Sequence, residues 1–570
     1  MIEKNCDLLC IGGGGAGVAA SVAASQKGAN VLLTSKEPIG YGNTRIIGGV
    51  MAYGDLDEEK TGEDFFRDMV VGGDYLNNQD LCELLAKEAH QATYLIESFG
   101  GVLGRDNEGK ITEKALIQLG GHTSPRTLFI PSTGPGIGQA LRYAVAREEI
   151  ETLENTLIVD LIHEGNHVFG AVGYELTKGD IVVIKAKKTL LATGGGGWVY
   201  YPNTDVSRVI TGDGYALGLN AGAELIDMEQ VQYIPFSLTH PPGLAGIVVG
   251  EPFTAGPAGV LRNVHGEDIL PGVHLKTRAQ VANAIILEVE KGNGTKHGGC
   301  LLDLKGNKKH PGGKMLFEQY TKGIFKNITD IIRLAYGPEA ASWEDPWDVY
   351  PSAHYFMGGV VIDGWGRVKG VGNLFACGEV SGGIHGGNRL GSVSLMELFI
   401  IGKRSGECAA SEMDNGHQKV GQNLINSYTE RLKGMFGCRG KNRPIEVKRD
   451  LQKAMWDYVG PAREGENLKT GIKLLASVKE KAKDLKISGA KRYNTELVDA
   501  VELGFMIPVS MSIAESALER EESRGAHVRL DFPKRDDDNW LKNIVIKKRG
   551  KDELEVSLRP VNLKKLKPSY

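Results

Sequence analysis

The stretch Asp7-Leu8-Leu9-Cys10-Ile11-Gly12-Gly13-Gly14-Gly15-Ala16-Gly17-Val18-Ala19-Ala20 is an apolar strand that runs into a glycine turn. Glycines at positions 12, 14 and 17 have the GxGxxG spacing, which lets the chain turn tightly, approach a pyrophosphate and pack a helix against the strand. An Ala-rich helix is expected at 16–27 and a second strand at Ala29–Thr34. This order predicts a dinucleotide site at the helix N-terminus, with a glycine-rich structural turn as the alternative.

The composition is typical of a large globular enzyme. The chain has 570 residues, a formal charge of −4 and 41% hydrophobic residues. This length exceeds a single hydrophobic core, so two to four domains are expected. The charge argues against nucleic-acid binding, and the basic C-terminal tail is expected to be a solvated edge. No apolar run reaches the ~18–20 residues of a membrane span, and the N-terminus has no export signal.

The seven cysteines are dispersed, without a CxxC or CxxCH spacing. Such spacings hold iron–sulfur clusters, haem and structural metals, so we expect no metal site in this chain. A scattered, odd number of cysteines is typical of a reducing compartment. The sequence therefore predicts a cytoplasmic protein.

The second strand lacks the acidic residue that an NAD-binding unit carries about 20 residues after its glycines. Ser35 and Lys36 stand there instead and offer groups for an adenosine ribose and a phosphate. Farther along, a strand ends at Thr193-Gly194, as if the chain re-entered the same sheet. Asp213 then lies in a tight turn before a helix, where its carboxylate is either a ligand or a simple cap.

Further motifs follow the glycine turn in a fixed order down to the C-terminal region. They are Ser35-Lys36, 42–49, 192–195, 211–214, 353–359, 374–379, His385-Gly386-Gly387-Asn388-Arg389-Leu390-Gly391-Ser392, 522–527 and 531–537. In this order the chain resembles the flavoprotein subunits of succinate dehydrogenase and fumarate reductase. L-aspartate oxidase and the adenylylsulfate reductase flavoprotein are relatives of that family. The resemblance covers nearly the whole chain.

The resemblance implies an α/β fold with a doubly wound, Rossmann-like FAD-binding domain, an inserted α+β capping domain and a C-terminal helical domain. A lid over a redox cofactor would exclude water from hydride transfer. In the C-terminal part, Glu446–Val459 and Asn467–Leu485 have amphipathic helical patterns that are broken at Gly460-Pro461. The expected domains are 1–234 with 350–415 for FAD, 235–349 for the cap, and 416–570 for the helical domain and tail.

By the same resemblance, FAD is the implied cofactor. Glu379 would bind the ribityl hydroxyls, and the region of Ser394 and Leu395 would meet the pyrimidine edge of the flavin. The implied FAD contacts are Gly12, Gly14, Gly15, Ala16, Gly17, Ser35, Lys36, Asn43, Thr44, Gly48, Gly49, Thr193, Gly194, Asp213, Glu379, Arg389, Ser394 and Leu395.

Position 43 departs from the family pattern. The membrane-bound respiratory enzymes have a histidine there that bonds covalently to the flavin and raises its potential. Asn43 cannot form that bond, so the resemblance implies noncovalent FAD with a lower potential. Such a flavin suits reduction of a substrate, or a low-potential donor, better than succinate oxidation by quinone.

The substrate motifs depart as well. The family supplies a histidine and a threonine to one substrate carboxylate, and Ile234 and Phe236 stand at those positions. Both read as pocket wall in this family, although they are also consistent with core packing. The Glu-Gly-x-Arg-Gly proton relay is not intact, because Glu251 lies nearby but out of register and the relay arginine is missing. An unpartnered buried carboxylate is costly, so we expect a substrate other than fumarate.

Three groups persist. Arg278 occupies the place of the catalytic arginine, and His354 and Arg389 occupy the places of the ligands to the other carboxylate. Hydride from flavin N5 would then reach one carbon while Arg278 protonates its neighbour and the other two polarise the anchoring group. The alternatives are an ordinary first-turn arginine of a helix Ala279–Glu290 and a core histidine. His122 is either pocket wall or structural, and Glu251 and His122 are the next proton-donor candidates.

The expected activity is flavin-dependent reduction or oxidation of an activated C–C bond in a carboxylate or carbonyl substrate. Two alternatives remain: an adenylylsulfate-reductase-like or L-aspartate-oxidase-like enzyme, and an electron-carrying flavin subunit with a vestigial pocket. The chain has no cluster-ligating cysteines and no second nucleotide fingerprint. The resemblance therefore implies an iron–sulfur partner subunit, and a complex that is cytoplasmic or held at a membrane surface through that partner.

Overall fold

The glycine turn follows the central strand of a seven-stranded sheet, in a computed structural model that describes residues 1–54, 56, 62–323, 325–413, 420–550 and 553–568. The strand order is β6-β2-β1-β9-β8-β7, with β17 also paired to β9. Pairing is parallel from β6 to β9 and antiparallel from β9 to β7. The bounds are β1 Ile2–Ile11, β2 Val31–Thr34, β6 Glu151–Leu153, β7 Thr156–Glu164, β8 His167–Glu175, β9 Asp180–Leu191 and β17 Leu374–Ala376.

Small residues bring the first helix against a helix from far along the chain. The expected helix at 16–27 is confirmed as α1 (Gly15–Gln26), which packs on α11 (Val393–Ser411). A Cβ atom on Gly406 would lie 2.1 Å from the carbonyl oxygen of Ala20, so only glycine permits this approach. The other helices of this half are α2 Asn43–Ile46, α3 Glu63–Gly72, α4 Gln79–Ser98, α5 Thr133–Arg147 and α6 Asp213–Asn220.

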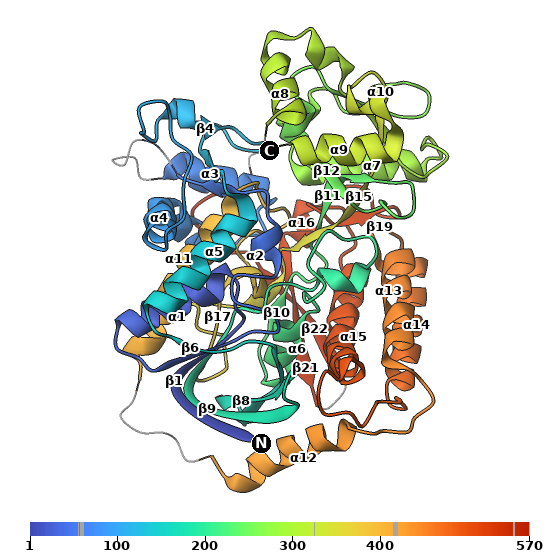
Figure 1. Ribbon diagram of the computed structural model, residues 1–570. Coiled ribbons are helices and arrows are strands. Elements are labelled where there is room, and N and C mark those ends of the chain that lie inside the picture. The colour runs from blue at the N-terminus through green and yellow to red at the C-terminus, as the bar shows by residue number, and fades with distance from the viewer. Residues whose placement is uncertain (55, 57–61, 324, 414–419, 551–552, 569–570) are drawn as a thin grey trace.

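A second lobe, called the cap below, lies at the top of Figure 1. It is built around an antiparallel sheet of order β12-β11-β15-β14-β13, the cap sheet. It has its own hydrophobic core, which includes Phe236, Trp343 and Trp347. The expected domain limits at 234/235 and 349/350 fall inside β11 and β15, and the limit at 415/416 lies outside the described residues; the division stays a prediction. The bounds are β11 Val231–Leu238, β12 Val248–Gly250, β13 Val260–Arg262, β14 Cys300–Asp303, β15 Trp347–Phe356, α7 Arg278–Glu290, α8 Pro311–Thr321, α9 Lys326–Tyr336 and α10 Pro338–Ala341.

The C-terminal part contains the two expected amphipathic helices. They are α13 (Pro444–Val459) and α14 (Gly465–Lys481), so the second ends four residues before Leu485. Figure 1 shows both in orange beside the long red helix α15 (Thr495–Glu519). Among the described residues only α15 is long and apolar enough to span a membrane, and 72% of its most apolar window is buried in the protein.

The end of the chain returns to the first half of the molecule. The strands β21 (Lys542–Arg549) and β22 (Glu553–Pro560) extend a sheet of order β18-β16-β10-β21-β22, which the sequence patterns did not indicate. The remaining elements are β3 Val50–Ala52, β4 Leu116–Ile117, β5 Thr127–Phe129, β10 Leu225–Ile226, β16 Gly359–Val361, β18 Ser381–Gly382, β19 Ala462–Arg463, β20 Val528–Arg529, α12 Gln422–Met435 and α16 Asp537–Trp540.

Buried ion pairs join these parts. Arg520 donates from Nε to Glu229 at 2.7 Å and from Nη1 to Glu522 at 3.0 Å, and all three side chains are fully buried. Arg524 shares Glu522 at 2.6 Å. Breaking one partner of such a cluster would leave an uncompensated buried charge. The cluster therefore fixes the residues after α15 against the loop between β10 and β11.

We expect Gly17→Ala to destabilise the protein by at least about 2 kcal/mol, because the added Cβ would lie 1.9 Å from the carbonyl oxygen of Gly12. Urea unfolding followed by circular dichroism measures this. Gly504→Ala on α15 is the matched control, since no heavy atom lies within 4 Å of its added Cβ, and helix propensity favours alanine. Equal midpoints for the two variants would contradict the close-packing account.

Candidate active site

A cavity of about 1040 Å³ lies where β1, β2, β9 and β17 end, facing the cap sheet and its helices. Ligands of open α/β sheets bind at this carboxyl edge. The residues that the sequence singled out for cofactor and substrate line the cavity, with Gly17 as the exception. They are Gly12, Gly14, Gly15, Ala16, Ser35, Lys36, Asn43, Thr44, Gly48, Gly49, Thr193, Gly194, Asp213, Arg278, His354, Glu379, Arg389, Ser394 and Leu395.

The glycine turn presents a free helix N-terminus to the cavity. Gly12 has φ +121°, and a Cβ there would lie 2.1 Å from the carbonyl oxygen of Ala192. The N-cap residue Gly14 has no side chain to cap α1, and the Gly15 N–H at the start of the helix donates to the Thr44 hydroxyl at 3.1 Å. Gly17 lies beneath the turn, where it permits contact between helix and strand. Backbone N–H groups and the helix dipole therefore suit an anion such as a pyrophosphate.

Lys36 lies at the far end of the cavity in a buried ion network. Its Nζ is 3.0 Å from Asp213 and 3.1 Å from Glu502 of α15, and it donates to the Thr211 hydroxyl at 2.9 Å. Glu502 also binds Lys448 at 2.6 Å. The ammonium group is thus already paired with two carboxylates, which the sequence did not indicate.

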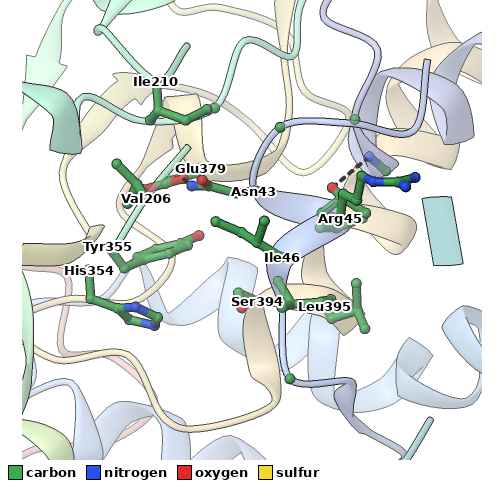
Figure 2. A pocket seen from close by; sticks show the side chains of 18 of the residues that line it. Asn43, Arg45, Ile46, Val206, Ile210, His354, Tyr355, Glu379, Ser394 and Leu395 are labelled. Atoms are coloured by element: carbon green, nitrogen blue, oxygen red, sulfur yellow. Dashed lines mark hydrogen bonds between the residues drawn. The ribbon is translucent and has the colours of Figure 1, made fainter. Parts of the chain in front are cut away.

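Asn43 and Glu379 form a polar bridge across the middle of the cavity, and Figure 2 shows the two side chains meeting there. Asn43 Nδ2 donates to Glu379 at 3.3 Å, and the Ser207 N–H donates to Asn43 Oδ1 at 2.9 Å. The Phe356 N–H donates to the second Glu379 oxygen at 3.1 Å. Burial raises the pKa of Glu379 to about 7. This carboxyl can therefore donate or accept a hydrogen bond near neutral pH.

Arg278 is both a first-turn arginine and a cavity residue. It begins α7 after the Thr277–Gln280 capping box, and its side chain is 7% exposed. Nε and Nη2 donate to the two oxygens of Glu251 at 2.7 and 2.6 Å. Nη1 is buried without a hydrogen-bond partner among the described residues. The structure thus joins Glu251 to Arg278 in a bidentate pair, a partnership that the sequence patterns did not indicate.

Arg389 is held by packing and by one hydroxyl. Its guanidinium lies 4.4 Å from the ring centroid of Tyr355, and Nη1 donates to Ser394 at 2.8 Å. Nε is buried and has no partner within the described chain. Burial, with Arg278 nearby, lowers the pKa of Arg389 to about 10, so it remains a cation at neutral pH.

His354 faces the cavity from a bulge in β15. The register with β11 shifts between the pairs Gln232–Tyr355 and Tyr233–Ala353, which leaves His354 as the extra residue. A bulge lets consecutive side chains face one side, and His354 and Tyr355 both line the cavity (Figure 2). Nδ1 of His354 is 2.8 Å from Asp205, a partner that the sequence analysis missed. The core-histidine alternative does not fit this position.

The two apolar residues that stand in place of the family's polar substrate ligands, Ile234 and Phe236, fall on two sides of the cap sheet. Ile234 lines the cavity, as expected. Phe236 is fully buried in the cap core, so its expected place in the pocket wall is wrong. His122 is buried, its Nε2 lies 3.1 Å from the Gly391 carbonyl oxygen, and burial lowers its pKa to about 4. These contacts favour the structural alternative for His122.

Glu397 is a second cavity residue that the sequence analysis missed. It is fully buried in the first turns of α11, and neither carboxyl oxygen has a partner within the described ranges. Burial raises its pKa to about 8. Its signal in the sequence is an acid three residues after Ser394, inside an apolar helix.

These features fit FAD. The cavity has the volume of a large cofactor, and one part of it holds an anion-binding helix N-terminus. Another part holds Arg278 Nη1, Arg389 Nε and the Glu397 carboxyl oxygens, which are buried and find no hydrogen-bond partner among the residues that the structure describes. Gly12 and Gly49 keep the backbone bare where a Cβ would meet the carbonyl oxygens of Ala192 and Ile130 at 2.1 and 2.7 Å.

Comparisons with known proteins agree with this assignment. Residues 7–395 match the model of the FAD binding domain family, and residues 448–570 match the model of the fumarate reductase flavoprotein C-terminal family. The chain is 34% identical to one of the subunits of the fumarate reductase (CoM/CoB) of Methanothermobacter marburgensis, over 95% of this chain and 97% of that protein.

Solved structures share the fold. The flavoprotein FrdA of Escherichia coli quinol fumarate reductase superposes with a TM-score of 0.90 at 30% identity, over 100% of this chain and 99% of that chain. Adenylylsulfate reductase from Archaeoglobus fulgidus gives 0.79 at 21% identity, over 100% and 97% of the two chains, which is a likeness of fold. The expected fold class and the FAD cofactor are confirmed.

We expect Glu397→Gln to raise the free energy of unfolding of the FAD-free protein, relative to the wild type, more at pH 8 than at pH 5. The folded pKa lies above the unfolded value near 4.5, so folding holds a proton that the unfolded chain has released, and stability falls as pH rises from about 4.5 to 8. A neutral amide at position 397 has no proton to release, so the variant should not show this fall in stability. Urea unfolding at both pH values measures it, with exposed Glu430→Gln as control. An unchanged pH dependence would contradict the protonated state of Glu397.

Proposed function

Because this chain belongs to the family of fumarate reductase and succinate dehydrogenase flavoprotein subunits, we propose that it is an FAD-dependent oxidoreductase acting on an activated C–C bond in a substrate other than fumarate. The observation that carries the proposal is the Arg278–Glu251 pair beside Arg389, His354 and apolar Ile234 in one cavity. These residues offer a proton donor, an anchor for one anionic or carbonyl group, and an apolar wall.

When bound, FAD would supply a hydride to one carbon of the C=C bond in the reducing direction, or accept it in the reverse direction. Arg278 would donate the proton to the neighbouring carbon through Nη1, the one guanidinium nitrogen that Glu251 leaves free. The C=C bond becomes C–C with one hydride and one proton added. Since arginine is a poor acid in water, this step needs a basic carbanion and a site from which water is excluded.

Glu251 orients and recharges the donor. Its carboxylate fixes the guanidinium plane through two short hydrogen bonds. Because Glu251 contacts Arg278 directly and lines the same cavity, it would return a proton to Arg278 after each turnover. The Arg278 and Glu251 relay supports catalysis over a purely electron-carrying role.

Arg389 and His354 would hold the anchoring group and take up the charge that develops on it. The opposite wall holds Ile234, with Phe253, Leu316 and Ile328 also lining the cavity. A second carboxylate against this wall would lose its hydration without gaining a partner. Relatives with fumarate reductase in their names match the chain at 34% and 32% identity, and the apolar wall is the reason for proposing a different preference.

The test is a panel of oxidants added anaerobically to the reduced holoprotein, with flavin absorbance near 450 nm as readout. Enoates with an apolar end, such as but-2-enoate and cinnamate, are expected to reoxidise the flavin faster than fumarate. Fumarate turnover above that of the other compounds would overturn the substrate proposal. Failure of every unsaturated acid or ketone would overturn the activity.

Arg278→Ala is expected to lower turnover ~10²-fold or more while FAD stays bound, because it removes the proton donor and leaves the glycine turn intact. Stopped-flow reoxidation of the flavin measures turnover, and absorbance gives the FAD content. Arg262→Ala, a half-exposed arginine paired with Asp303 in the cap, is the matched control. Near-normal turnover of Arg278→Ala would move the donor role to Glu251.

Electrons for the flavin must come from outside this chain, and we propose that an iron–sulfur partner protein supplies them. The assignment rests on the family and on the absence of a cluster-ligating cysteine pattern. The complex would be cytoplasmic or held at a membrane surface by its partner.

Native purification tests both the iron–sulfur partner protein and the noncovalent binding of FAD. Iron and labile sulfide are expected in a second polypeptide, and acid precipitation is expected to release FAD into the supernatant, because Asn43 cannot bond covalently to it. A homodimer that reacts rapidly with oxygen to give hydrogen peroxide would contradict the partner. Flavin retained in the acid pellet would contradict noncovalent binding.

A further inference from the structure

Carboxylates accompany two of the three cationic side chains at the substrate end of the cavity. Glu251 binds Arg278 at 2.6 and 2.7 Å, and Asp205 lies 2.8 Å from His354. Arg389 donates to the Ser394 hydroxyl and forms no ion pair within the described part of the chain. The set therefore carries one positive charge when His354 is protonated, and none when it is neutral.

Asp205 is built into the cavity wall. Its N–H donates to the Ala353 carbonyl oxygen at 3.3 Å, and Thr204 donates to the same oxygen at 2.7 Å, so the loop is fixed on β15 beside the His354 bulge. Oδ2 meets His354, while Oδ1 is buried and has no hydrogen-bond partner among the described residues. An unpartnered acceptor that lines a cavity is available to a ligand or repels one, according to the charge of the ligand.

The charge balance bears on what the cavity accepts. One substrate carboxylate can be neutralised by Arg389 with His354. Among these three cationic side chains a second carboxylate would find none that is free, because Glu251 already holds Arg278, and it would lie in the same cavity as the carboxylate of Asp205. Like charges brought together in a desolvated site oppose binding strongly. Ile234 offers such a group no hydrogen bond.

We infer that Asp205 is a specificity-determining residue that admits unsaturated monocarboxylates to this site and rejects dicarboxylates. This inference rests on the proposed function and names its substrate class. Asp205 acts by repulsion, because its carboxylate balances the positive charge on His354 that a second substrate carboxylate would need. Asp205 also holds the imidazole of His354 in a fixed orientation through Nδ1.

The test compares fumarate with monomethyl fumarate, which keeps the activated C=C bond and replaces one charge with a neutral ester. We expect kcat/KM for reoxidation of the reduced holoprotein to be at least ~10-fold higher with the monoester. Asp205→Asn keeps a hydrogen-bond acceptor for His354 and removes the charge. This variant is expected to shrink the ratio of kcat/KM for monomethyl fumarate to kcat/KM for fumarate ~10-fold or more, mainly through a lower KM for fumarate.

Asp363→Asn is the control, since Asp363 is an exposed aspartate paired with Arg367 that does not line the cavity; its ratio should equal that of the wild type. A second measurement needs no variant: monomethyl succinate should perturb the oxidised flavin spectrum of the wild type at a lower concentration than succinate. Equal ratios in wild type and Asp205→Asn, or tighter binding of succinate, would overturn the inference alone. Loss of all enoate turnover in the wild type would overturn the proposed function as well.

Discussion

The structure depends on the close approach of three backbone segments at Gly12. A side chain there would lie 2.1 Å from the carbonyl oxygen of Ala192, and one at Gly17 would lie 1.9 Å from that of Gly12 itself. Bare backbone at these two positions lets β1, β9 and the start of α1 meet at one point. At this point the N-terminus of α1 faces the cavity, and its N-cap residue Gly14 supplies no capping side chain. The cofactor site is thus a consequence of packing that only glycine permits.

The end of the cavity that holds the proposed catalytic residues follows from a different constraint, because it is assembled from both lobes. The strands β11 and β15 run from the FAD half into the cap sheet, so Ile234 and His354 stand where the lobes meet. Arg278 and Glu251 come from the cap, and Arg389 comes from the segment before α11. Charges from the two lobes are balanced against one another in this space. Because desolvation strengthens each pairing, the position of the cap determines which of these charged groups are paired in the cavity.

Local signals in the sequence predicted the local structure. The glycine turn and the helices α1, α7 and α13 follow from residue patterns within short stretches of the sequence. The candidate site residues came instead from the family resemblance, and the cavity brings most of them together. The partner of Arg278 could not be found this way, because its pairing with Glu251 depends on how two cap segments meet. Two irregularities in β pairing account for two further differences. A register shift between Ile234 and Ser237 accompanies the turn of Phe236 into the cap core, and the bulge at His354 brings it to Asp205.

The central claim is that one anchored anion lies between Arg389 and His354, with Arg278 Nη1 beside the carbon that is protonated. A crystal structure of the holoprotein with monomethyl succinate tests it most directly. We predict the carboxylate on Arg389 and His354, the ester end against Ile234, and Arg278 Nη1 within about 3.5 Å of a methylene carbon. A carboxylate bound at the Ile234 wall, or an Arg278 turned away from the ligand, would contradict it.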